Sequence, residues 1–393
     1  MRGLVVWGGG PVRALRARPL AGAEVVSWPG ADPEALGAAG VPFRRLEDVI
    51  GPEGLAASEA AGRSWARVWA RLPLVEGRSF RDLVEWRGES LLFAAEGFLR
   101  TATAGPRCAR TAELCLRLLE ALQPAELDAY GLAPSDSVLL ARAATASGVL
   151  FHGEAGAAKP LASVPATQEP WALRRLFQGF LPKRPSLLDA GPAPCDAPLI
   201  LCLVGREQDR VTLAPLVQAA HAEAATRALL LAADALPRLG TRRSRRAVAE
   251  GERRLRERLA TLRGTPAVAA SHVHRGVGFA DLAACDLDAL LLGRLPAALR
   301  TLEAGVALFE QARPVLVVLA VADRDERRTL GMAASAAGLP WVTLRGEAGA
   351  DEEPDRADGG PHPLASLTLT PGEDAAALFA RLREFARDRV GTA

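Results

Sequence analysis

The chain of 393 residues is long enough for roughly two to three domains of about 150 residues each. Apolar residues make up 49% and charged residues 24%, which excludes a largely disordered chain and supplies material for sizeable cores. The 48 Lys and Arg residues nearly balance the 46 Asp and Glu residues, and a net charge of +2 argues against nucleic-acid binding through the overall field of the protein.

The amino-terminal segment predicts a short strand that ends in a glycine turn. The apolar run Leu4–Trp7 is too short for a signal peptide, and no apolar stretch reaches about 18 residues without a charge, so we expect a cytoplasmic protein. The turn consists of Gly8, Gly9 and Gly10. Because glycine permits close backbone approach, this turn is a candidate phosphate cradle. The alternative is a tight turn without a ligand, since neither GxGxxG nor a Walker lysine follows.

The chain contains an internal repeat. Residues 110–148 and 300–338 align without a gap and share eleven identities in 39 positions. Each copy predicts a helix that ends before a proline, Pro124 in one and Pro314 in the other. In the second copy the run Val315–Ala322 is continuously apolar, which is typical of a parallel strand covered on both faces. The corresponding strand of the first copy is predicted to be weaker.

These elements predict an α/β fold of two tandem Rossmann-like domains that arose by duplication and face each other across a cleft. A second strand and turn, Leu199–Val204 with Gly205, begins the second copy. We therefore expect one domain over residues 1–165 and another over 197–393, joined by a linker rich in proline over 166–196. Asp323 follows the apolar run, where it can cap the next helix or meet a sugar hydroxyl or a divalent ion.

His152 is the sharpest candidate for chemistry. It directly follows the apolar residues Val149–Phe151, so we expect its imidazole at a strand end, acting as a general base or contacting a phosphate. Glu154 can orient the imidazole or act itself. The equivalent residues of the second copy are Arg345, Gly346, Glu347 and, further on, Gly349. Arginine binds anions but is no base at neutral pH. We therefore expect the first half to provide the base and the second half to provide the anion site. The alternative is a structural histidine on a loop.

Other clusters carry weaker signals. His272 and His274 point the same way if Val268–Val273 is a strand, and Asp281 is the nearest carboxylate. A metal there is the lesser hypothesis, and we predict no metal site. The five cysteines form no CxxC pair, which favours buried thiols in a reducing compartment.

The stretch Arg242–Arg258 predicts an amphipathic helix in which glutamates interleave with many arginines. Such a helix is either a solvated face or a contact with anionic lipid head groups, which would make the protein peripheral to the inner membrane. Trp65 and Trp69, at positions i and i+4, predict packing or, as the alternative, stacking on a sugar ring.

Several of these segments resemble bacterial surface-carbohydrate and capsule glycosyltransferases. The similar residues are Glu303 with its helix, the strand before Asp323, the helix that ends at Gly338, Arg345-Gly346, His152-Gly153 and Trp86–Phe93. The resemblance implies the GT-B arrangement, with a donor sugar nucleotide in the carboxy-terminal domain and an acceptor in the amino-terminal one. His152 then matches the histidine of the family's dipeptide.

The resulting hypothesis is a metal-independent glycosyltransferase of surface polysaccharide biosynthesis. It would transfer a sugar from a nucleotide donor to a carbohydrate or lipid-linked acceptor, with the nucleotide sugar as substrate and no separate cofactor. His152 would be the base, and the loop from Arg345 to Gly349 would hold the donor phosphates electrostatically. One alternative is a non-catalytic duplicated module that acts as scaffold or partner of a true transferase. Another is an enzyme resembling nucleotide-sugar epimerases.

Overall fold

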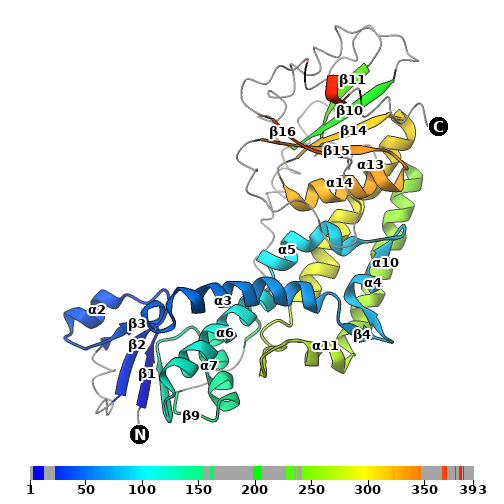
Figure 1. The fold of residues 1–393 in the computed structure, drawn as a ribbon. Coiled ribbons are helices and arrows are strands. Elements are labelled where there is room, and N and C mark those ends of the chain that lie inside the picture. Colours follow the sequence, from blue (N-terminus) through cyan, green and yellow to red (C-terminus); the bar gives the residue numbers. More distant parts are fainter. Residues whose placement is uncertain are drawn as a thin grey trace. The chain divides into compact units, whose positions relative to one another are not determined.

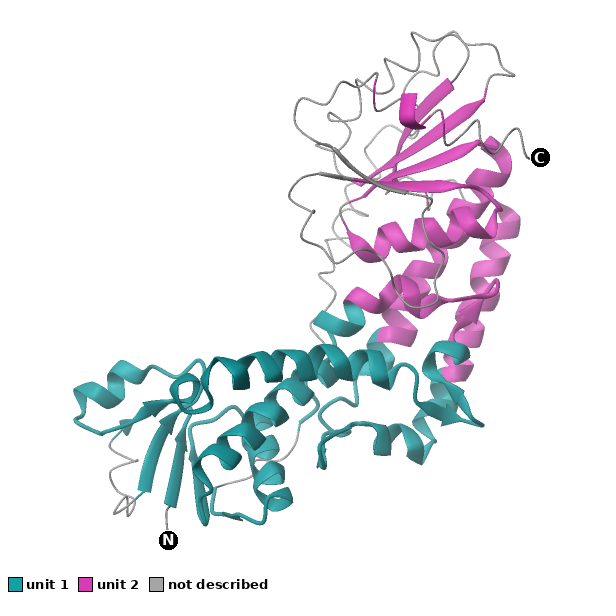
Figure 2. Cartoon of the chain, viewed as in Figure 1, with its two compact units in different colours: residues 1–83, 98–167, 259–289 teal, residues 84–97, 168–258, 290–393 magenta. Residues whose placement is uncertain are grey.

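The computed structural model describes residues 3–12, 23–153, 159–162, 198–205, 227–233, 236, 241–321, 323–346, 365–369, 377, 380–382 and 384. The chain forms two compact units, each assembled from separate stretches (Figure 2). Unit 1 comprises residues 1–83, 98–167 and 259–289, and unit 2 comprises residues 84–97, 168–258 and 290–393. The predicted α/β class is confirmed. The units are not contiguous in the sequence, so their limits differ from those of the predicted domains 1–165 and 197–393, and that domain division stays a prediction. Most of the predicted linker lies outside the described residues.

The sheet of unit 1 has five parallel strands in the order β3-β2-β1-β8-β9 (Figure 1). They are β1 Gly3–Trp7, β2 Ala23–Ser27, β3 Arg44–Arg45, β8 Glu126–Tyr130 and β9 Leu150–Phe151. Strand β1 is central because both of its faces are apolar, and Leu4 to Trp7 are at most 4% exposed. The chain first adds strands on one side of β1 and later on the other, so the strand order reverses between β1 and β8.

Helices of unit 1 pack closely where glycines meet bulky neighbours. Those assigned to unit 1 alone are α2 Pro33–Ala38, α3 Leu46–Trp69, α4 Phe80–Leu83, α6 Ala104–Leu122, α7 Pro134–Ala146, α11 Pro266–Ser271 and α12 Asp286–Asp288. A Cβ added at Gly62 of α3 would lie 2.9 Å from the carbonyl oxygen of Pro106 on α6. A Cβ at Gly105 would lie 2.2 Å from the Trp65 ring. Side chains here would force α3 and α6 apart.

Unit 2 contains a second sheet of five parallel strands, in the order β11-β10-β14-β15-β16. They are β10 Leu199–Val204, β11 Arg227–Ala232, β14 Leu316–Ala320, β15 Trp341–Gly346 and β16 Ala365–Leu369. All six residues of β10 are buried, as its continuous apolar run predicts. The strand order reverses between β10 and β14, after the second strand of the order, whereas in unit 1 it reverses after the third.

Among the elements with described bounds, the helices assigned to unit 2 alone are η1 Leu91–Ala95, α13 Leu295–Ala312 and α14 Arg324–Ala336. Residues of both units occur in α5 Glu96–Thr101, in α10 Arg242–Arg263 and in the π-helix Ala289–Arg294. The remaining described strands form short antiparallel pairs: β4 Pro73–Val75 with β5 Arg78–Ser79, β6 Glu85–Trp86 with β7 Glu89–Ser90, and β12 Val273–His274 with β13 Val277–Gly278.

The repeat read from the sequence is present in the elements. Helices α7 and α14 begin and end at positions that the alignment of the two copies equates, and the same holds for strands β8 and β14. Helices α6 and α13 also end at equivalent positions, each followed by a left-handed residue with φ of 45°, Gln123 and Arg313. The weaker strand of the first copy forms as β8 because Leu127 and Ala129 are buried while Glu126 points to solvent.

The strand over Val268–Val273 on which the metal hypothesis depended does not form. Helix α11 occupies Pro266–Ser271, and only Val273 and His274 belong to a strand. Pro266 stands at the first helical turn, where its fixed φ favours helix initiation, and the following alanines have high helix propensity. These local preferences outweigh the short apolar run.

Candidate functional site

The glycine turn lies where the strand order of unit 1 reverses. The amide of Gly8 donates to the carbonyl oxygen of Tyr130, 2.8 Å away, at the end of β8. A Cβ at Gly8 would lie 2.7 Å from the carbonyl oxygen of Gly131, and a Cβ at Gly131 only 1.9 Å from that of Gly9. The two loops therefore cross so closely that glycine is required on both. Open α/β sheets bind ligands where the strand order reverses. The two interpretations of the turn, a tight crossing of loops and a phosphate-binding site, therefore both stay open.

A carboxyl group that the sequence analysis missed follows the same sheet edge. Asp136 lies in the first turn of α7, and its Oδ2 accepts a hydrogen bond of 2.9 Å from the indole of Trp28, which follows β2. Burial raises the pKa of Asp136, opposed by the hydrogen bonds from Trp28 and Ser135. A carboxyl with a raised pKa beside a strand end is typical of functional groups, although buried structural acids share it. A polar residue after Pro134 at a strand end was the available signal.

His152 follows the edge strand β9, as predicted. Because β9 pairs with Glu126 and Leu127, His152 lies beside the middle of β8, short of the end where the glycine turn crosses. Its backbone N–H donates to the carbonyl oxygen of Leu127 at 2.8 Å. Its Nε2 lies 3.2 Å from Oε2 of Glu126, and both side chains are about half exposed. The carboxylate described beside His152 is thus Glu126, while Glu154 lies outside the described residues.

The predicted anion site of the second half is described only in part. Arg345 and Gly346 end β15 and pair with Thr368 and Leu369 of β16. Their side-chain surroundings, Glu347 and Gly349 lie outside the described residues. Asp323 is described, and it caps α14: its Oδ1 accepts the amide of Glu326 at 2.8 Å. The capping alternative is therefore confirmed for Asp323, and a ligand role stays a prediction.

Buried charged groups gather at the first turns of α14. Asp325 Oδ1 accepts the amide of Gly97 at 2.8 Å, and its Oδ2 accepts a hydrogen bond of 3.1 Å from Arg294. Arg328 donates to Glu96 at 2.7 Å, and its guanidinium lies 4.8 Å from the centre of the Phe93 ring. Asp325 and Arg328 are at most 4% exposed. Because Glu96, Gly97 and Phe93 belong to one segment, these charges anchor residues 84–97 in unit 2.

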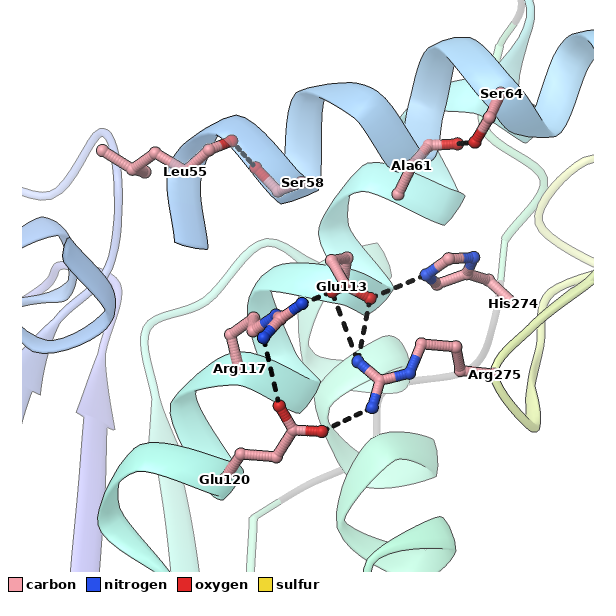
Figure 3. A network of polar contacts seen from close by, with 9 residues as sticks. All are labelled: Leu55, Ser58, Ala61, Ser64, Glu113, Arg117, Glu120, His274 and Arg275. Atoms are coloured by element: carbon pink, nitrogen blue, oxygen red, sulfur yellow. Dashed lines mark hydrogen bonds and ion pairs between the residues drawn. The ribbon is translucent and has the colours of Figure 1, made fainter. Parts of the chain in front are cut away.

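Glu113, on α6 of unit 1, is the centre of a polar network (Figure 3). It is almost fully buried and lies 2.8 Å from Nε2 of His274 and 2.8 Å from Nε of Arg117. Arg275 reaches both oxygens of Glu113 at 3.2 to 3.3 Å and also binds Glu120. Burial by itself would raise the pKa of Glu113, but the hydrogen bonds from His274, Arg117 and Arg275 outweigh it and lower the pKa.

Glu303, on α13 of unit 2, aligns with Glu113 in the repeat and is 1% exposed. Its Oε1 accepts hydrogen bonds of 2.7 Å from the Trp86 indole and 2.6 Å from Nε of Arg87. Its Oε2 accepts a further bond of 2.9 Å from Arg87, which makes the pair bidentate. The Trp86 ring also lies 5.4 Å from the guanidinium carbon of Arg254. The repeat aligns the two glutamates in sequence, but nothing local indicates these partners.

The side chains of the metal hypothesis have separate partners. His272 Nδ1 lies 2.7 Å from the carbonyl oxygen of Val268, His274 binds Glu113, and Asp281 accepts two bonds of 2.7 Å from Arg142. No cluster of three or more His, Cys, Asp or Glu side chains able to hold a metal occurs in the part of the chain that is described. Burial lowers the pKa of His272, opposed by its bond to Val268, as expected of an imidazole in an aromatic core.

The tryptophan pair packs in the interior of unit 1. Trp65 and Trp69 are at most 7% exposed, stack with ring centres 5.7 Å apart, and surround His272. The packing interpretation is therefore confirmed. Among the cysteines, Cys108, Cys115 and Cys202 are buried as expected, and burial raises the pKa of Cys108 to about 12. Cys285 is exposed, which differs from the expectation, and Cys195 lies outside the described residues.

The arginine-rich stretch forms helix α10, as predicted. Leu255, Leu259 and Leu262 are buried on one face, and the opposite face carries ion pairs such as those of Glu250 with Arg253 and Arg254. Within the described ranges, no helix combines the length and apolar character that a membrane span requires.

No protein-family model and no curated protein matches this sequence. The resemblance to surface-carbohydrate glycosyltransferases therefore rests on the residues named above.

Proposed function

We propose that the protein is a GT-B-like glycosyltransferase with two tandem Rossmann-like domains, acting in the cytoplasm on bacterial surface polysaccharide. One observation carries the proposal: a single chain contains two five-stranded parallel sheets, and the strand order of each reverses once, between β1 and β8 in one and between β10 and β14 in the other. Ligands of open α/β sheets bind beside such reversals. Two such reversals in one chain would give two binding sites, one for a nucleotide sugar and one for an acceptor.

In this proposal the amino-terminal half binds the acceptor and the carboxy-terminal half the donor. His152 removes the proton from the acceptor hydroxyl as its oxygen bonds to the anomeric carbon, and the bond from that carbon to the nucleotide phosphate breaks. The exposed carboxylate of Glu126, 3.2 Å from Nε2 of His152, stabilises the imidazolium that forms. Arg345 holds the departing diphosphate, together with the residues Gly346, Glu347 and Gly349 that follow it in the sequence, and no metal takes part. The Gly8–Gly10 turn is the second candidate for phosphate.

Binding of a nucleotide tests the proposal first. UDP-, CDP- or GDP-linked sugars should raise the melting temperature of the full chain, because a ligand bound only by the folded state stabilises it. Arg345→Ala should abolish that shift, and Arg44→Ala, which removes an exposed arginine paired with Glu24, should preserve it. The proposal is wrong if the folded protein responds to none of these nucleotides.

Sugar transfer tests the role of His152. With lipid-linked and soluble glycan acceptors, His152→Ala should lower kcat by about 100-fold or more, as removal of a general base does, while the nucleotide-induced thermal shift remains. Full transfer by His152→Ala would remove that assignment and leave the donor site standing. Incubation with donor alone, followed by sugar analysis, identifies an epimerase.

A scaffold for a true transferase is the second candidate. It is favoured by the charged residues Asp325 and Arg328 near the end of β14. Both form hydrogen bonds to the segment 84–97, which is a structural role and not a ligand-binding one. Co-purification with a transferase, together with a flat thermal response to nucleotides, would support it. In either function, α10 would contact anionic lipid heads at the inner membrane through the arginines between 242 and 258.

A further inference from the structure

Two hairpins of the chain share an arginine-glycine turn and the same backbone pairing. In the first, Trp86 pairs with Glu89, and in the second His274 pairs with Val277. In each hairpin the two central residues are an arginine followed by a glycine, and both have positive φ. The values are 53° and 80° at Arg87-Gly88, and 47° and 85° at Arg275-Gly276. Two consecutive positive φ values characterise the turns that match the twist of a two-residue hairpin.

The backbone that closes each hairpin is also equivalent. The amide of Leu91 donates to the carbonyl oxygen of Val84 at 3.0 Å, and the amide of Phe279 donates to that of His272 at 2.8 Å. When the two turns are superimposed on their arginines, the donors of these bonds align with each other, and so do the acceptors. The hairpins therefore belong to the repeat, although the aligned stretch that reveals the repeat in the sequence contains neither of them.

The hairpin of the first half belongs to unit 2. Arg87 and Trp86 together give three hydrogen bonds to Glu303, a residue of the second half. The residues that follow the hairpin continue the contact, since Glu96 binds Arg328 and Gly97 binds Asp325. The partners are 216 to 232 residues apart in the sequence.

The hairpin of the second half belongs to unit 1. His274 and Arg275 bind Glu113, a residue of the first half. The residues that follow continue this contact as well. Asp281 forms a bidentate pair with Arg142, and the buried Asp286 accepts the amides of Ala104 and Gly105 at 2.7 and 2.8 Å, which caps α6.

We infer that the chain is a fused dimer whose two halves, residues 1–165 and 197–393, have exchanged equivalent hairpins. The face of α6 around Glu113 and the face of α13 around Glu303 are docking surfaces, and the occupant of each is the hairpin of the other half. Each hairpin supplies an arginine to a carboxylate of the other half that is at most 5% exposed, and removing one partner of such a buried ion pair is strongly destabilising. Each half is thus the binding partner of the other. The inference is independent of the proposed sugar transfer.

Cleavage of the full chain tests the exchange. A recognition sequence for a site-specific protease is inserted within residues 168–197, the chain is purified, and the link is cut to completion. The two fragments should elute together at the mass of the uncut chain in size-exclusion chromatography with light scattering. Fragments that elute apart, each with native circular dichroism, would overturn the inference.

Point variants of the cut protein tie the association to the hairpins. Arg87→Met removes the guanidinium that binds Glu303, and Arg275→Met removes the one that binds Glu113, while each variant keeps an apolar side chain. Each should raise the dissociation constant of the two fragments by at least about tenfold. Arg44→Met, in an exposed pair within the first half, should stay within about twofold of the unsubstituted cut protein. Equal dissociation constants for all three variants would also overturn the inference. If a variant fails to fold, two other measurements test the inference. These are the dissociation constant of Arg87→Lys and the elution of the unsubstituted cut protein.

Discussion

Glu113 and Glu303 occupy equivalent places on equivalent helices, yet their surroundings differ. Glu303 accepts hydrogen bonds from Trp86 and from Arg87, which grips both of its oxygens. Glu113 is shared among His274, Arg117 and Arg275, and the last two reach onward to Glu120 near the surface. Unit 2 therefore has a compact bidentate clamp, and unit 1 has a wider network.

The comparison separates what the two copies share from what differs between them. The carboxylate, the arginine of the turn and the hairpin register are the same in both copies. The neighbouring donor is tryptophan in one and histidine in the other. A buried carboxylate requires satisfied oxygens, and several donor sets satisfy them equally. The shared pattern is therefore the buried acid held by an arginine, and the other donors were free to diverge.

Removal of the turn arginines should break this comparison most strongly. Arg87→Ala leaves the buried Glu303 with the Trp86 indole as its described donor, so the free energy of unfolding of unit 2 should fall by about 3–5 kcal/mol. Arg275→Ala leaves Glu113 with His274 and Arg117, so its cost should be smaller, about 1–2 kcal/mol. Urea unfolding followed by circular dichroism measures both. Equal losses would mean that the two clamps are energetically alike.

Glycines at one helix contact in each unit extend the comparison. Gly62 of α3 faces the Pro106 carbonyl on α6, and Gly251 of α10 faces the side chain of Leu299 on α13, where an added Cβ would lie 2.4 Å from a methyl carbon. Because a leucine can rotate and a backbone carbonyl cannot, Gly62→Ala should destabilise by about 1–3 kcal/mol and Gly251→Ala by less. Thermal unfolding ranks the two variants, and the reverse order would contradict this account.

Loss of the tryptophan donor should have an intermediate effect. Trp86→Phe removes the 2.7 Å bond to Glu303 but keeps an aromatic ring beside Arg254, so we expect a loss of about 1–2 kcal/mol in the free energy of unfolding. Combined with Arg87→Ala, the loss should be non-additive, because both residues bind one carboxylate. A double-mutant cycle in urea gives the coupling, and strict additivity would argue against a shared site.

The smallest expected effect concerns the pH dependence of stability that Glu113 contributes. The pKa of Glu113 lies below its ordinary value of 4.5, so its ionised form stabilises the folded state above that pH. This contribution is lost as the pH falls below 4.5 through the lowered pKa of the folded state. Glu113→Gln has no such group, so its urea midpoint should fall less between about pH 5 and pH 3, a range set by the ordinary value. Parallel profiles of the two proteins would contradict the lowered pKa.

Local sequence predicted the elements of the repeat because their signals are local. The apolar run of β14, the helices that end before Pro124 and Pro314, and the cap at Asp323 all depend on residues within a few positions of one another. The same local reasoning failed at residues 268–273, where Pro266 and its alanines favour a helix. Around His152, sequence adjacency suggested Glu154, whereas strand pairing brings Glu126 beside it.

The sequence by itself determined the α/β class, the duplication and the central elements of each repeat, since hydrophobic periodicity and turn residues encode them directly. The tertiary structure alone decided where each hairpin goes. Trp86 and Glu303 are 217 residues apart, and His274 and Glu113 are 161 apart. No periodicity links such residues. Glu113 has one donor from its own half, Arg117, and the other described donors of the two carboxylates come from the opposite half, because a buried carboxylate requires satisfied oxygens.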